Sequence, residues 1–562
     1  MVWKINDDYA GREMQKIWHL VVPYTRGRCL DVGSGQIRVF SHWITQDSGK
    51  DYGERRVADI RADGEKEILF ADGSLDAIVS SHFLEHCHNW MGAIGLWWSK
   101  LKPGGYLVLY WPHPDHYPKV GQPGANPDHK HDIYPEMVRG LMAAKAGGWE
   151  LLEDETRTDD AEYSQFMVFR KAKDPKDQTQ TVKPWRRPPK SVLVIRYGAF
   201  GDALMAASIL PELKKQGWHV TFNGQSDSCA VLAADPHIDH LILQDKDQVP
   251  NENLGQYWGM LAKRYDRVIQ LNESVENTTL VLPGSSKDKW PAELRRKMLG
   301  GINYLEFTHD LAEVPHVFHQ RFYPTDQEKA LALEQKQTVC GDRPLIAWSL
   351  KGSSVHKVWP YTRAVIARLI FKTDAVVMLL GGKDCEEFEK SILTYVAELC
   401  GRDALKRIWV ASGVLPIRAS MVFATQCADV LIGPETGVMN AAAQEAVQKV
   451  IFLSHSNQEN LTKHWTNTRV LESFPACRPC HQLHYGWDRC TQDKATGAAL
   501  CQSLIDPDTA EAAIMAALND AREAKRIVAS VSETAADRET FEAPADELLP
   551  PPLDPIGTAS AA

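Results

Sequence analysis

The chain alternates short apolar runs with amphipathic stretches along most of its length. Runs such as "DAIVSS", "SVLVIRY", "AVVMLLGG" and "DVLIGPE" are rich in β-branched residues and short enough to be single strands. Runs of this kind, separated by helical periodicity, are typical of parallel strands that are buried on both faces. The sequence therefore predicts an α/β fold whose parallel sheets are covered by helices. Its 562 residues leave room for about three domains or more.

Two breaks in composition divide the chain. Residues 171–190 are rich in Pro, Lys and polar side chains, which predicts an interdomain linker long enough to let its neighbours act separately. Beyond Arg526 the sequence cannot bury enough apolar surface to offset its ordering entropy, which predicts disorder. The predicted units are a first domain (1–171), a linker (172–190), two halves of a second region (191–335 and 336–525) and a tail (526–562).

Charge and hydropathy exclude several classes of function. The net charge of −10 argues against general nucleic-acid binding, which shows a basic footprint. No apolar run approaches the roughly 18 residues of a membrane span, and the polar, acidic start is unlike a signal peptide. Most of the eleven cysteines are scattered in apolar segments, which fits reduced thiols in the cytoplasm.

The stretch "CLDVGSGQIRVFSHWITQD" predicts a nucleotide site of an unusual kind. A strand turns on Gly33-Ser34-Gly35, but the third glycine of the dinucleotide fingerprint is absent. Only eleven residues separate Gly35 from Asp47, which leaves little room for a helix that would face a phosphate. An adenosine ligand without phosphate needs no such helix. Asp47 can then accept hydrogen bonds from both ribose hydroxyls, and Asp63 (or Asp59) can accept one from the adenine amino group.

Three motifs in this region carry a family resemblance. "LDVGSG", "FADGSLDAIVSSHFLEH" and "LKPGGYLVLYWP" occur in this order, and together they resemble class I S-adenosylmethionine-dependent methyltransferases over residues 27–171. The resemblance implies a Rossmann-like domain with S-adenosylmethionine as its cofactor. It also implies that Gly33 and Gly35 pass beneath the methionine and ribose, with Asp31 near the amino group. The short connection departs from the longer family pattern, although a subgroup shares it.

A histidine-rich loop, "YWPHPDHYPKVGQPGANPDHKHD", follows the strand that contains Tyr110. One interpretation is an acceptor site in which His113, His129 or His131 takes a hydroxyl proton during methyl transfer. A second is a metal site, because His-x-x-His and His-x-His are ligand pairs. A third is a rigid loop whose histidines cap backbone groups. His86, in the preceding "LEH", is interpreted as structural.

A second glycine-rich turn, "RYGAFGDALMAAS", places Asp202 in the first turn of a long amphipathic helix. A carboxylate there is held ionised by the helix dipole and suits a general base. The same position suits an N-capping aspartate. The local sequence does not separate the two roles.

Three later strands end in residues suited to a nucleotide sugar. Basic and hydroxyl side chains that follow "LIAWSL" can hold phosphate oxygens. An acid that follows "LLGG" can bind a ribose. The turn that follows "DVLIGP" begins a helix whose N-terminus can bind a diphosphate. The candidate residues are Ser353, Ser354, Lys357, Glu386, Glu435, Thr436 and Gly437.

Residues 191–518 resemble glycosyltransferase family 9, the lipopolysaccharide heptosyltransferases. The resemblance rests on "VIRYGAFGDALMAASILPELK", "ADPHIDHLILQD", "YDRVIQL", "KVWP", "LLGG" and "ETGVMNAAA". It implies a GT-B fold of two Rossmann-like halves, with Asp202 as the base and inversion at the donor's anomeric carbon. It further implies that Lys357, Ser353 and Ser354 stabilise the departing nucleoside diphosphate. The donor half has no Asp-x-Asp metal motif after an apolar strand, which favours a metal-free mechanism. Glu435 and Asn440 depart from the usual aspartate and histidine, so heptose is not implied.

A cysteine cluster, "CRPCHQLHYGWDRC…C", lies near the end of this region. Cys477, Cys480, Cys490 and Cys501 suggest structural zinc, although their spacing is irregular for a zinc ribbon. A disulfide and free packed thiols are the alternatives.

Together the two resemblances predict a cytoplasmic, bifunctional glycan-modifying enzyme. It would use S-adenosylmethionine and a nucleotide-diphosphate sugar on a glycan or lipopolysaccharide-type acceptor, through peripheral contact with a membrane-borne glycolipid and without nucleic acid. The alternatives are an enzyme with one active half and a non-enzymatic glycan-binding protein that keeps both folds.

Overall fold

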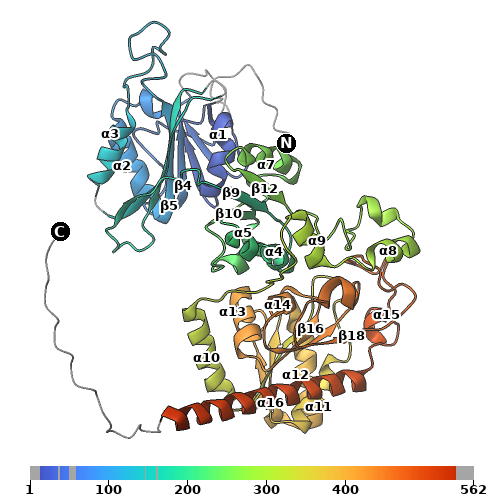
Figure 1. Ribbon diagram of the computed structural model, residues 1–562. Coiled ribbons are helices and arrows are strands. Elements are labelled where there is room, and N and C mark those ends of the chain that lie inside the picture. The colour runs from blue at the N-terminus through green and yellow to red at the C-terminus, as the bar shows by residue number, and fades with distance from the viewer. Residues whose placement is uncertain (1–12, 36–37, 50–57, 146, 160–161, 540–562) are drawn as a thin grey trace, which may run out of the picture.

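The computed structural model describes residues 13–35, 38–49, 58–145, 147–159 and 162–539. It contains three sheets, one in the first domain and one in each half of the region that follows (Figure 1). This arrangement confirms the predicted α/β class. Among the described residues, none of the helices combines the length and the apolar character that a membrane crossing requires.

The first domain is built on an eight-stranded sheet in the order β3-β2-β1-β4-β5-β7-β6-β8. Strand β7 runs antiparallel to both β5 and β6, and the other pairings are parallel. Its strands are β1 (Cys29–Val32), β2 (Ile44–Asp47), β3 (Ile60–Arg61), β4 (Leu75–Ser81), β5 (Leu101–Pro112), β6 (Trp149–Arg157), β7 (Ser164–Lys171) and β8 (Gln180–Val182). Its helices are α1 (Glu13–Val21), α2 (Trp90–Lys100) and α3 (Pro135–Ala143). The order reverses between β1 and β4, where open α/β sheets bind ligands.

The connection from β1 to β2 matches the prediction of a missing helix. Within its described residues the chain forms only turns and bends. Phe40 and Trp43 fill the space beneath with their fully buried side chains, 4.6 Å apart at the ring centres. The connection therefore covers the sheet with two aromatic rings instead of a helix.

The half that is predicted to hold the acceptor (191–335, called the acceptor half, with 336–525 as the donor half) has a parallel sheet in the order β11-β10-β9-β12. Its strands are β9 (Ser191–Ile195), β10 (His219–Gly224), β11 (His240–Leu243) and β12 (Arg267–Gln270), and its helices include α4 (Phe200–Ala207), α5 (Leu210–Lys215), α7 (Leu254–Ala262), α8 (Ala292–Leu299) and α9 (Tyr304–Leu311). The single long helix predicted after Gly201 is wrong, because the chain breaks between α4 and α5. Pro211 has no N–H to continue the first helix and sits instead in the opening turn of the second.

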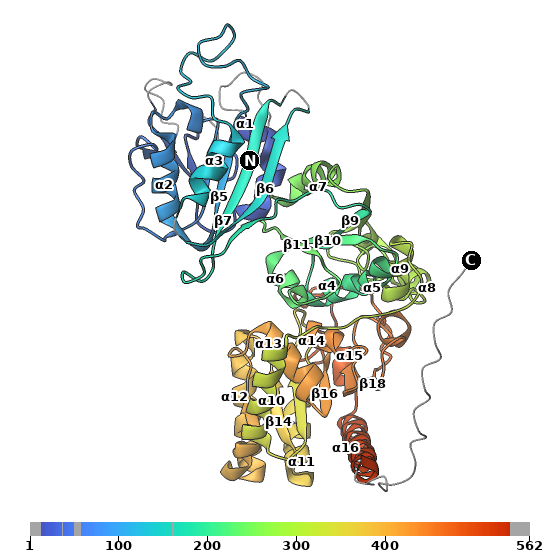
Figure 2. The same ribbon diagram turned by 60° about the vertical axis from the view of Figure 1, so that its left-hand side comes forward.

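The donor half has a parallel six-stranded sheet in the order β15-β14-β13-β16-β17-β18. Its strands are β13 (Leu345–Ser349), β14 (Val376–Leu380), β15 (Ile408–Val410), β16 (Val430–Pro434), β17 (Gln448–Phe452) and β18 (Thr468–Leu471). Helices α10 (Asp326–Cys340), α11 (Thr362–Lys372), α12 (Glu386–Cys400), α13 (Ile417–Val422), α14 (Gly437–Ala441) and α16 (Pro507–Glu539) surround it (Figure 2). The predicted boundary between 335 and 336 falls inside α10, which packs on α13 and so belongs to this half.

Helix α16 corrects the start of the predicted disordered tail. It runs along the donor half and continues to Glu539, beyond the predicted boundary at 526 (Figure 1). Residues 526–539 are mostly Ala, Glu, Arg, Ser and Val, without Gly or Pro, so helix propensity lets the last turns continue. Residues 540–562 of the predicted tail lie outside the described part of the chain.

The predicted linker is held against the protein. Its β8 segment pairs in parallel with β6, and the indole of Trp185 lies 3.9 Å from the Arg264 guanidinium that follows α7. The prediction that this segment lets its neighbours act separately is therefore wrong. The sequence did not predict the pairing of this segment with β6, because β8 has only three residues, none fully buried, between charged neighbours.

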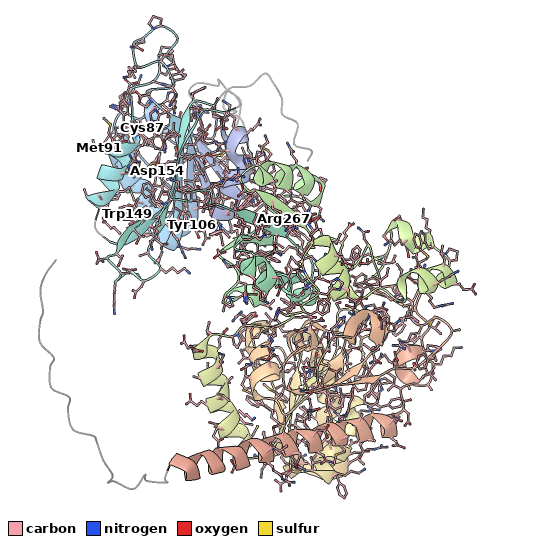
Figure 3. The ribbon with its side chains drawn as sticks, in the orientation of Figure 1. Cys87, Met91, Tyr106, Trp149, Asp154 and Arg267 are labelled. Carbon is pink, nitrogen blue, oxygen red and sulfur yellow. The ribbon has the colours of Figure 1, made fainter. Side chains whose placement is uncertain are left out.

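The first domain and the acceptor half share one hydrophobic core. It includes Trp18 of α1 and Tyr257 of α7, whose rings lie 5.8 Å apart. At its edge the buried carboxylate of Glu153 accepts hydrogen bonds from Tyr24 at 2.8 Å and from Arg264 at 3.0 and 3.3 Å. In Figure 3, Tyr106 lies in the first domain and Arg267 in the acceptor half, and the side chains between them meet along this boundary. The two units are packed as one body.

Candidate functional sites

The glycine turn after β1 is fixed by the end of β2. The Gly33 N–H donates to the Gln46 carbonyl at 2.8 Å, and the Gly35 N–H donates to Asp47 Oδ2 at 3.0 Å. Gly33 has a φ of +72°, and a Cβ there would lie 2.3 Å from Cγ of Phe83. Only glycine tolerates both the left-handed backbone and this close ring. The turn therefore lies at the carboxyl ends of β1 and β2, with the Phe83 ring packed on Gly33.

Several polar atoms around this turn lack partners, which fits a polar ligand such as S-adenosylmethionine. Within the described residues, no hydrogen bond reaches the buried hydroxyls of Ser34, Ser80 and Ser81 or the Gln46 side-chain oxygen. Ser34 follows β1, Gln46 lies in β2, and the other two end β4, so these atoms lie at neighbouring strand ends. Orphaned buried polar atoms are costly and rare, and a bound ligand is one way to satisfy them.

Two carboxylates lie at the same strand ends. Asp31 is buried, and burial together with the nearby Asp47 raises its pKa to about 8. Asp47 also accepts the Gly49 N–H at 2.7 Å, so its carboxylate is oriented by two glycine amides. Asp63 follows β3 and accepts the Glu65 N–H at 3.1 Å. Asp59 is engaged by Thr45 and is structural.

The histidine-rich loop does not bring all its predicted residues together. The His113 ring accepts the Asp115 N–H at 3.2 Å and stacks near His116, and burial lowers its pKa. His131 turns outward, with Nε2 3.1 Å from the His88 carbonyl oxygen. Of the three candidates, only His129 points into a cluster of ionisable groups, where burial and His86 lower its pKa to about 4.

Sequence reasoning missed Glu85 at the centre of that cluster. It belongs to the short 3-10 helix η2 (Leu84–His86), directly after β4. Its side chain is 2% exposed, and burial raises its pKa to about 8. The sequence offered only the acid within "LEH", where His86 was interpreted as structural and Glu85 was not considered.

The second candidate site is a cleft of ≈ 530 Å³ between the acceptor and donor halves. Both halves contribute strand ends and helix starts to its lining. The sequence-predicted residues that line it are Asp202, Ser353, Lys357, Glu435, Thr436 and Gly437.

Two glycines set how closely the halves approach. A Cβ on Gly437 would lie 2.8 Å from Cβ of Phe200, and one on Gly201 would lie 2.9 Å from Nδ2 of Asn440. Helices α4 and α14 therefore meet through residues that lack side chains. This contact brings the start of α4, which carries Asp202, to the start of α14.

Asp202 is the third residue of α4, so it is not itself the N-cap that was one of its two predicted roles. Its Oδ2 accepts the N–H of the N-cap residue Ala199 at 2.8 Å, which stabilises the start of α4. Its Oδ1 lies 3.0 Å from the buried Arg196 guanidinium, which also binds Glu276 at 3.0 Å. The carboxylate thus stabilises the helix start and also faces the cleft, and its role as a base stays a prediction.

Lys357 is a cation in the lining of the cleft, on the same side as Glu435 and Thr436. Burial lowers the pKa of its ammonium, and the charges of Glu435 and Asp202 oppose that shift. Ser353 lines the same cleft, whereas Ser354 is buried and lines an adjoining pocket. A desolvated ammonium beside two hydroxyl residues suits phosphate oxygens.

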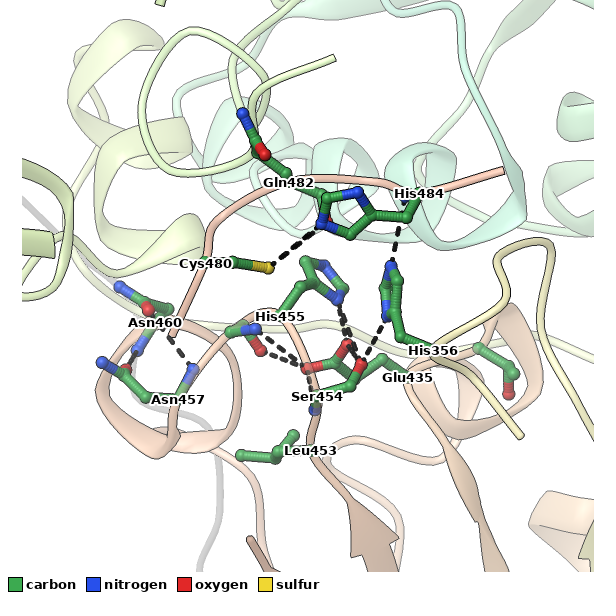
Figure 4. A network of polar contacts seen from close by, with 12 residues as sticks. His356, Glu435, Leu453, Ser454, His455, Asn457, Asn460, Cys480, Gln482 and His484 are labelled. Atoms are coloured by element: carbon green, nitrogen blue, oxygen red, sulfur yellow. Dashed lines mark hydrogen bonds and ion pairs between the residues drawn. The ribbon is translucent and has the colours of Figure 1, made fainter. Parts of the chain in front are cut away.

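Glu435 is held in a dense network of polar contacts (Figure 4). Its oxygens accept hydrogen bonds from Ser454 Oγ at 2.9 Å and from the hydroxyl of Ser456, and it forms an ion pair with His455. Burial alone would raise the pKa of Glu435, but His455 and Lys357 hold it well below its usual range. Its carboxylate therefore lines the cleft and holds the loop that follows β17 in place.

Glu386 does not reach the cleft, so its predicted ribose contact has no support. Its side chain is 68% exposed and pairs with Lys390 one helical turn onward. After Gly382 the chain forms a short 3-10 helix, which carries Asp384 into the lining and Glu386 past it. Asp384 is the acid that sequence reasoning missed at this strand end.

The four clustered cysteines are all free thiols in the structure. Cys480 Sγ lies 3.6 Å from Nε2 of His484, and its pKa is raised to about 12 by burial, with smaller contributions from Cys477 and Cys490. Cys501 is affected by the other three in the same way. The fold thus gathers the four, while the predicted zinc stays a prediction.

Residues 30–109, from β1 to β5, match the family model described as a methyltransferase domain. The chain therefore carries a methyltransferase domain at its N-terminal end, followed by two Rossmann-like halves that face each other across a cleft.

Among curated proteins, none is similar in sequence. Solved structures similar to this one include the Escherichia coli ADP-heptose lipopolysaccharide heptosyltransferase II, with 16% identity, coverage of 59% of this chain and 99% of that chain, and a TM-score of 0.42. A glycosyltransferase family 9 protein from Veillonella parvula has 16% identity, 59% and 98% coverage, and a TM-score of 0.43. A SAM-dependent methyltransferase from Archaeoglobus fulgidus has 18% identity, 28% and 94% coverage, and a TM-score of 0.22.

Proposed function

We propose that the chain is a bifunctional glycan-modifying enzyme. Its first domain transfers a methyl group from S-adenosylmethionine, and its two following halves transfer a sugar from a nucleoside-diphosphate donor in the manner of heptosyltransferases. The observation that carries the proposal is the cleft that Asp202 lines from one half and Lys357 and Thr436 line from the other. A base and a phosphate-binding cation on opposite walls are what displacement of a nucleoside diphosphate needs.

In the proposed reaction an acceptor hydroxyl attacks the anomeric carbon of the donor. Asp202 takes the hydroxyl proton as the new carbon–oxygen bond forms and the bond to the diphosphate breaks on the opposite face, which inverts the anomeric centre. The electron pair leaves with the diphosphate, whose charge Lys357 and Ser353 stabilise. Thr436 and Gly437 supply backbone amides at the start of α14 on the same wall.

Asp202→Asn tests this proposal. An asparagine keeps an oxygen that can accept the Ala199 N–H, so the start of α4 stays stabilised. It cannot take a proton, so sugar transfer should fall by about 10²–10⁴-fold while donor binding is kept. Glu276→Gln is the matched control, because it changes the other partner of Arg196 and leaves Asp202 in place. Full transfer by Asp202→Asn would remove it as the base.

For methyl transfer we propose that the turn of Gly33 and Gly35 receives the methionine and ribose. Asp31 would face the amino group, Asp47 the ribose and Asp63 the adenine. A histidine of the loop, His113, His129 or His131, would take the acceptor's proton. Titration calorimetry with S-adenosylmethionine tests the site: a folded protein with no affinity for it would leave the first domain as a non-catalytic module.

We further propose a lipopolysaccharide-type acceptor on a membrane-borne glycolipid at the cytoplasmic face. Enzymes with one active half and glycan-binding proteins without turnover are the competing functions. A thermal-shift screen of nucleotide sugars and S-adenosylmethionine separates them, because each ligand stabilises only the site that binds it. Stabilisation by both classes of ligand with turnover of neither would favour the binding protein.

The zinc prediction for Cys477, Cys480, Cys490 and Cys501 also belongs to this proposal. Zinc held by these thiols should be lost in Cys480→Ser. Less than about 0.2 zinc per chain attributable to the cluster would end this interpretation.

A further inference from the structure

A buried carboxylate in the first domain is surrounded by imidazole nitrogens. Oε1 of Glu85 lies 3.8 Å from Nδ1 of His82, 4.0 Å from Nε2 of His86 and 3.7 Å from Nε2 of His129. His82 and His86 flank Glu85 in the segment after β4, whereas His129 comes from the histidine-rich loop. Two segments that are distant in sequence thus converge on one oxygen.

None of these contacts is a hydrogen bond. Nitrogen-to-oxygen hydrogen bonds are about 2.7–3.2 Å long, and here every separation is at least 3.7 Å. Within the described residues, neither side-chain oxygen of Glu85 has a hydrogen-bond partner, although the side chain is only 2% exposed. A buried carboxylate without a partner is strongly disfavoured. The arrangement lacks a group that would sit between the carboxylate and the imidazoles.

The ligand-type atoms of Glu85, His86 and His129 all lie within 4.8 Å of one another. The rings of His86 and His129 stand edge to face, with centres 4.8 Å apart. Ligand atoms about 2.1 Å from a tetrahedral metal ion are about 3.4 Å apart, roughly 0.3–0.6 Å closer than the two contacts to Glu85. Binding of an ion would therefore draw the three side chains closer together.

A second cluster in the donor half shows what a satisfied arrangement looks like. His356, Glu435 and His455 also bring their ligand-type atoms within 4.8 Å. There, however, Glu435 accepts hydrogen bonds from Ser454 and Ser456 and is paired with His455 (Figure 4). That carboxylate needs no ion. The orphaned oxygens of Glu85 therefore distinguish the site in the first domain.

We propose that Glu85, His86 and His129 bind one divalent transition-metal ion of the zinc class. A set of two imidazoles and a carboxylate binds ions of this class in preference to Mg²⁺ or Ca²⁺, because Mg²⁺ and Ca²⁺ take oxygen ligands. Three protein ligands leave at least one coordination position open. The His86 side chain is 29% exposed, so solvent or a small ligand reaches that position. The proposal is independent of the sugar-transfer function, and a metal-bound His129 leaves His113 or His131 as the base for methyl transfer.

His82 lies beside Glu85 without forming a hydrogen bond to it. Its Nε2 lies 2.9 Å from Oγ of Ser164 in β7, which directs Nδ1 toward the carboxylate. Its φ of +48° lies in the left-handed region, which is uncommon for a histidine. Such conformations persist where the surroundings hold them, and they cluster at functional sites.

Cobalt(II) substitution of the full-length protein tests the site. An ion bound by nitrogen and oxygen gives visible ligand-field bands, whereas binding to the cysteine cluster adds a near-ultraviolet thiolate band. We expect one Co²⁺ per chain with the first signature, in addition to any ion that the cysteine cluster binds with the second. Glu85→Gln and His129→Ala should each weaken its binding at least about 100-fold, more than the loss of an outer-shell partner does. Zn²⁺ should displace it, and Mg²⁺ in excess should not.

His131→Ala is the matched control, because His131 lies on the same loop but turns away to the His88 carbonyl. It should keep the visible bands. Circular dichroism confirms that each variant is folded, and His129→Ala keeps the test valid if the isosteric Glu85→Gln fails to fold. Equal Co²⁺ binding by the wild type and both ligand variants would overturn the proposal. So would a folded wild type that shows only the thiolate signature.

Discussion

Removing the negative charge of Glu153 should uncouple the first domain from the acceptor half. The carboxylate lies on β6 of the first domain, and its cationic partner, Arg264, follows α7 of the acceptor half. Both side chains are largely buried, with 3% and 16% exposed. The pair exists only while the two units are docked, so its loss weakens their contact and not either sheet.

The size of the effect follows from the contacts that Glu153→Gln loses. The two hydrogen bonds that Arg264 donates to the carboxylate, at 3.0 and 3.3 Å, become bonds to the single uncharged oxygen of the glutamine amide. Breaking a buried ion pair by neutralising one partner costs about 3–5 kcal/mol, since the other charge stays buried. Glu155 remains 3.9 Å from Arg264 and compensates in part. We therefore expect a loss of about 3 kcal/mol in the free energy of unfolding, the low end of that range.

Urea denaturation, followed by tryptophan fluorescence and by far-ultraviolet circular dichroism, measures this effect. The wild type should show one transition for the first domain and the acceptor half, and Glu153→Gln should separate them. The double variant Glu153→Leu/Arg264→Met replaces the pair by apolar side chains and should recover most of the stability. A loss below about 1 kcal/mol in Glu153→Gln, or separate transitions in the wild type, would refute the reasoning.

Three further outcomes test other parts of the structure. Asp47→Ala should weaken S-adenosylmethionine binding about 10–100-fold in calorimetry, because a charged acceptor for the ribose hydroxyls is lost, while sugar transfer is unchanged. Gly437→Ala should destabilise the protein by about 1–3 kcal/mol by forcing α4 and α14 apart, whereas Gly255→Ala, where a Cβ meets nothing within 4 Å, should not destabilise it. The guanidinium of Arg418, with hydrogen bonds from Thr325, lowers the pKa of Glu328 to about 2. The ionised Glu328 carboxylate therefore stabilises the folded protein above about pH 4.5, and this stabilisation is lost as the pH falls toward 2. Glu328→Gln should therefore be less stable than the wild type at pH 6 and equal to it near pH 2.

The sequence predicted an α/β fold with parallel sheets because its short apolar runs alternate with helical stretches. It also predicted the missing helix between β1 and β2, since chain length alone limits what fits between Gly35 and Asp47. It did not predict the docking of β8, because a three-residue edge strand leaves almost no periodicity. The match of residues 30–109 to a methyltransferase domain agrees with the motifs read from the sequence.

The sites divide in the same way. Asp202, Lys357 and Thr436 were predicted because each lies in the loop or helix start that follows a buried strand, and the structure brings them to one cleft. Glu386 was misplaced because a short 3-10 helix, which no pattern announces, shifts the chain past the lining. Glu85 was missed because its role depends on a histidine more than forty positions away, a relation that only the folded chain displays.

The core shared by the first domain and the acceptor half has a consequence for any substrate modified at both sites. Helices α1 and α7 are locked together, so the methyl-transfer turn and the sugar-transfer cleft cannot swing toward each other. An acceptor that receives both groups must either span the fixed distance between the two sites or leave one and be captured again by the other. Acceptor length would then decide whether methylated intermediates escape into solution.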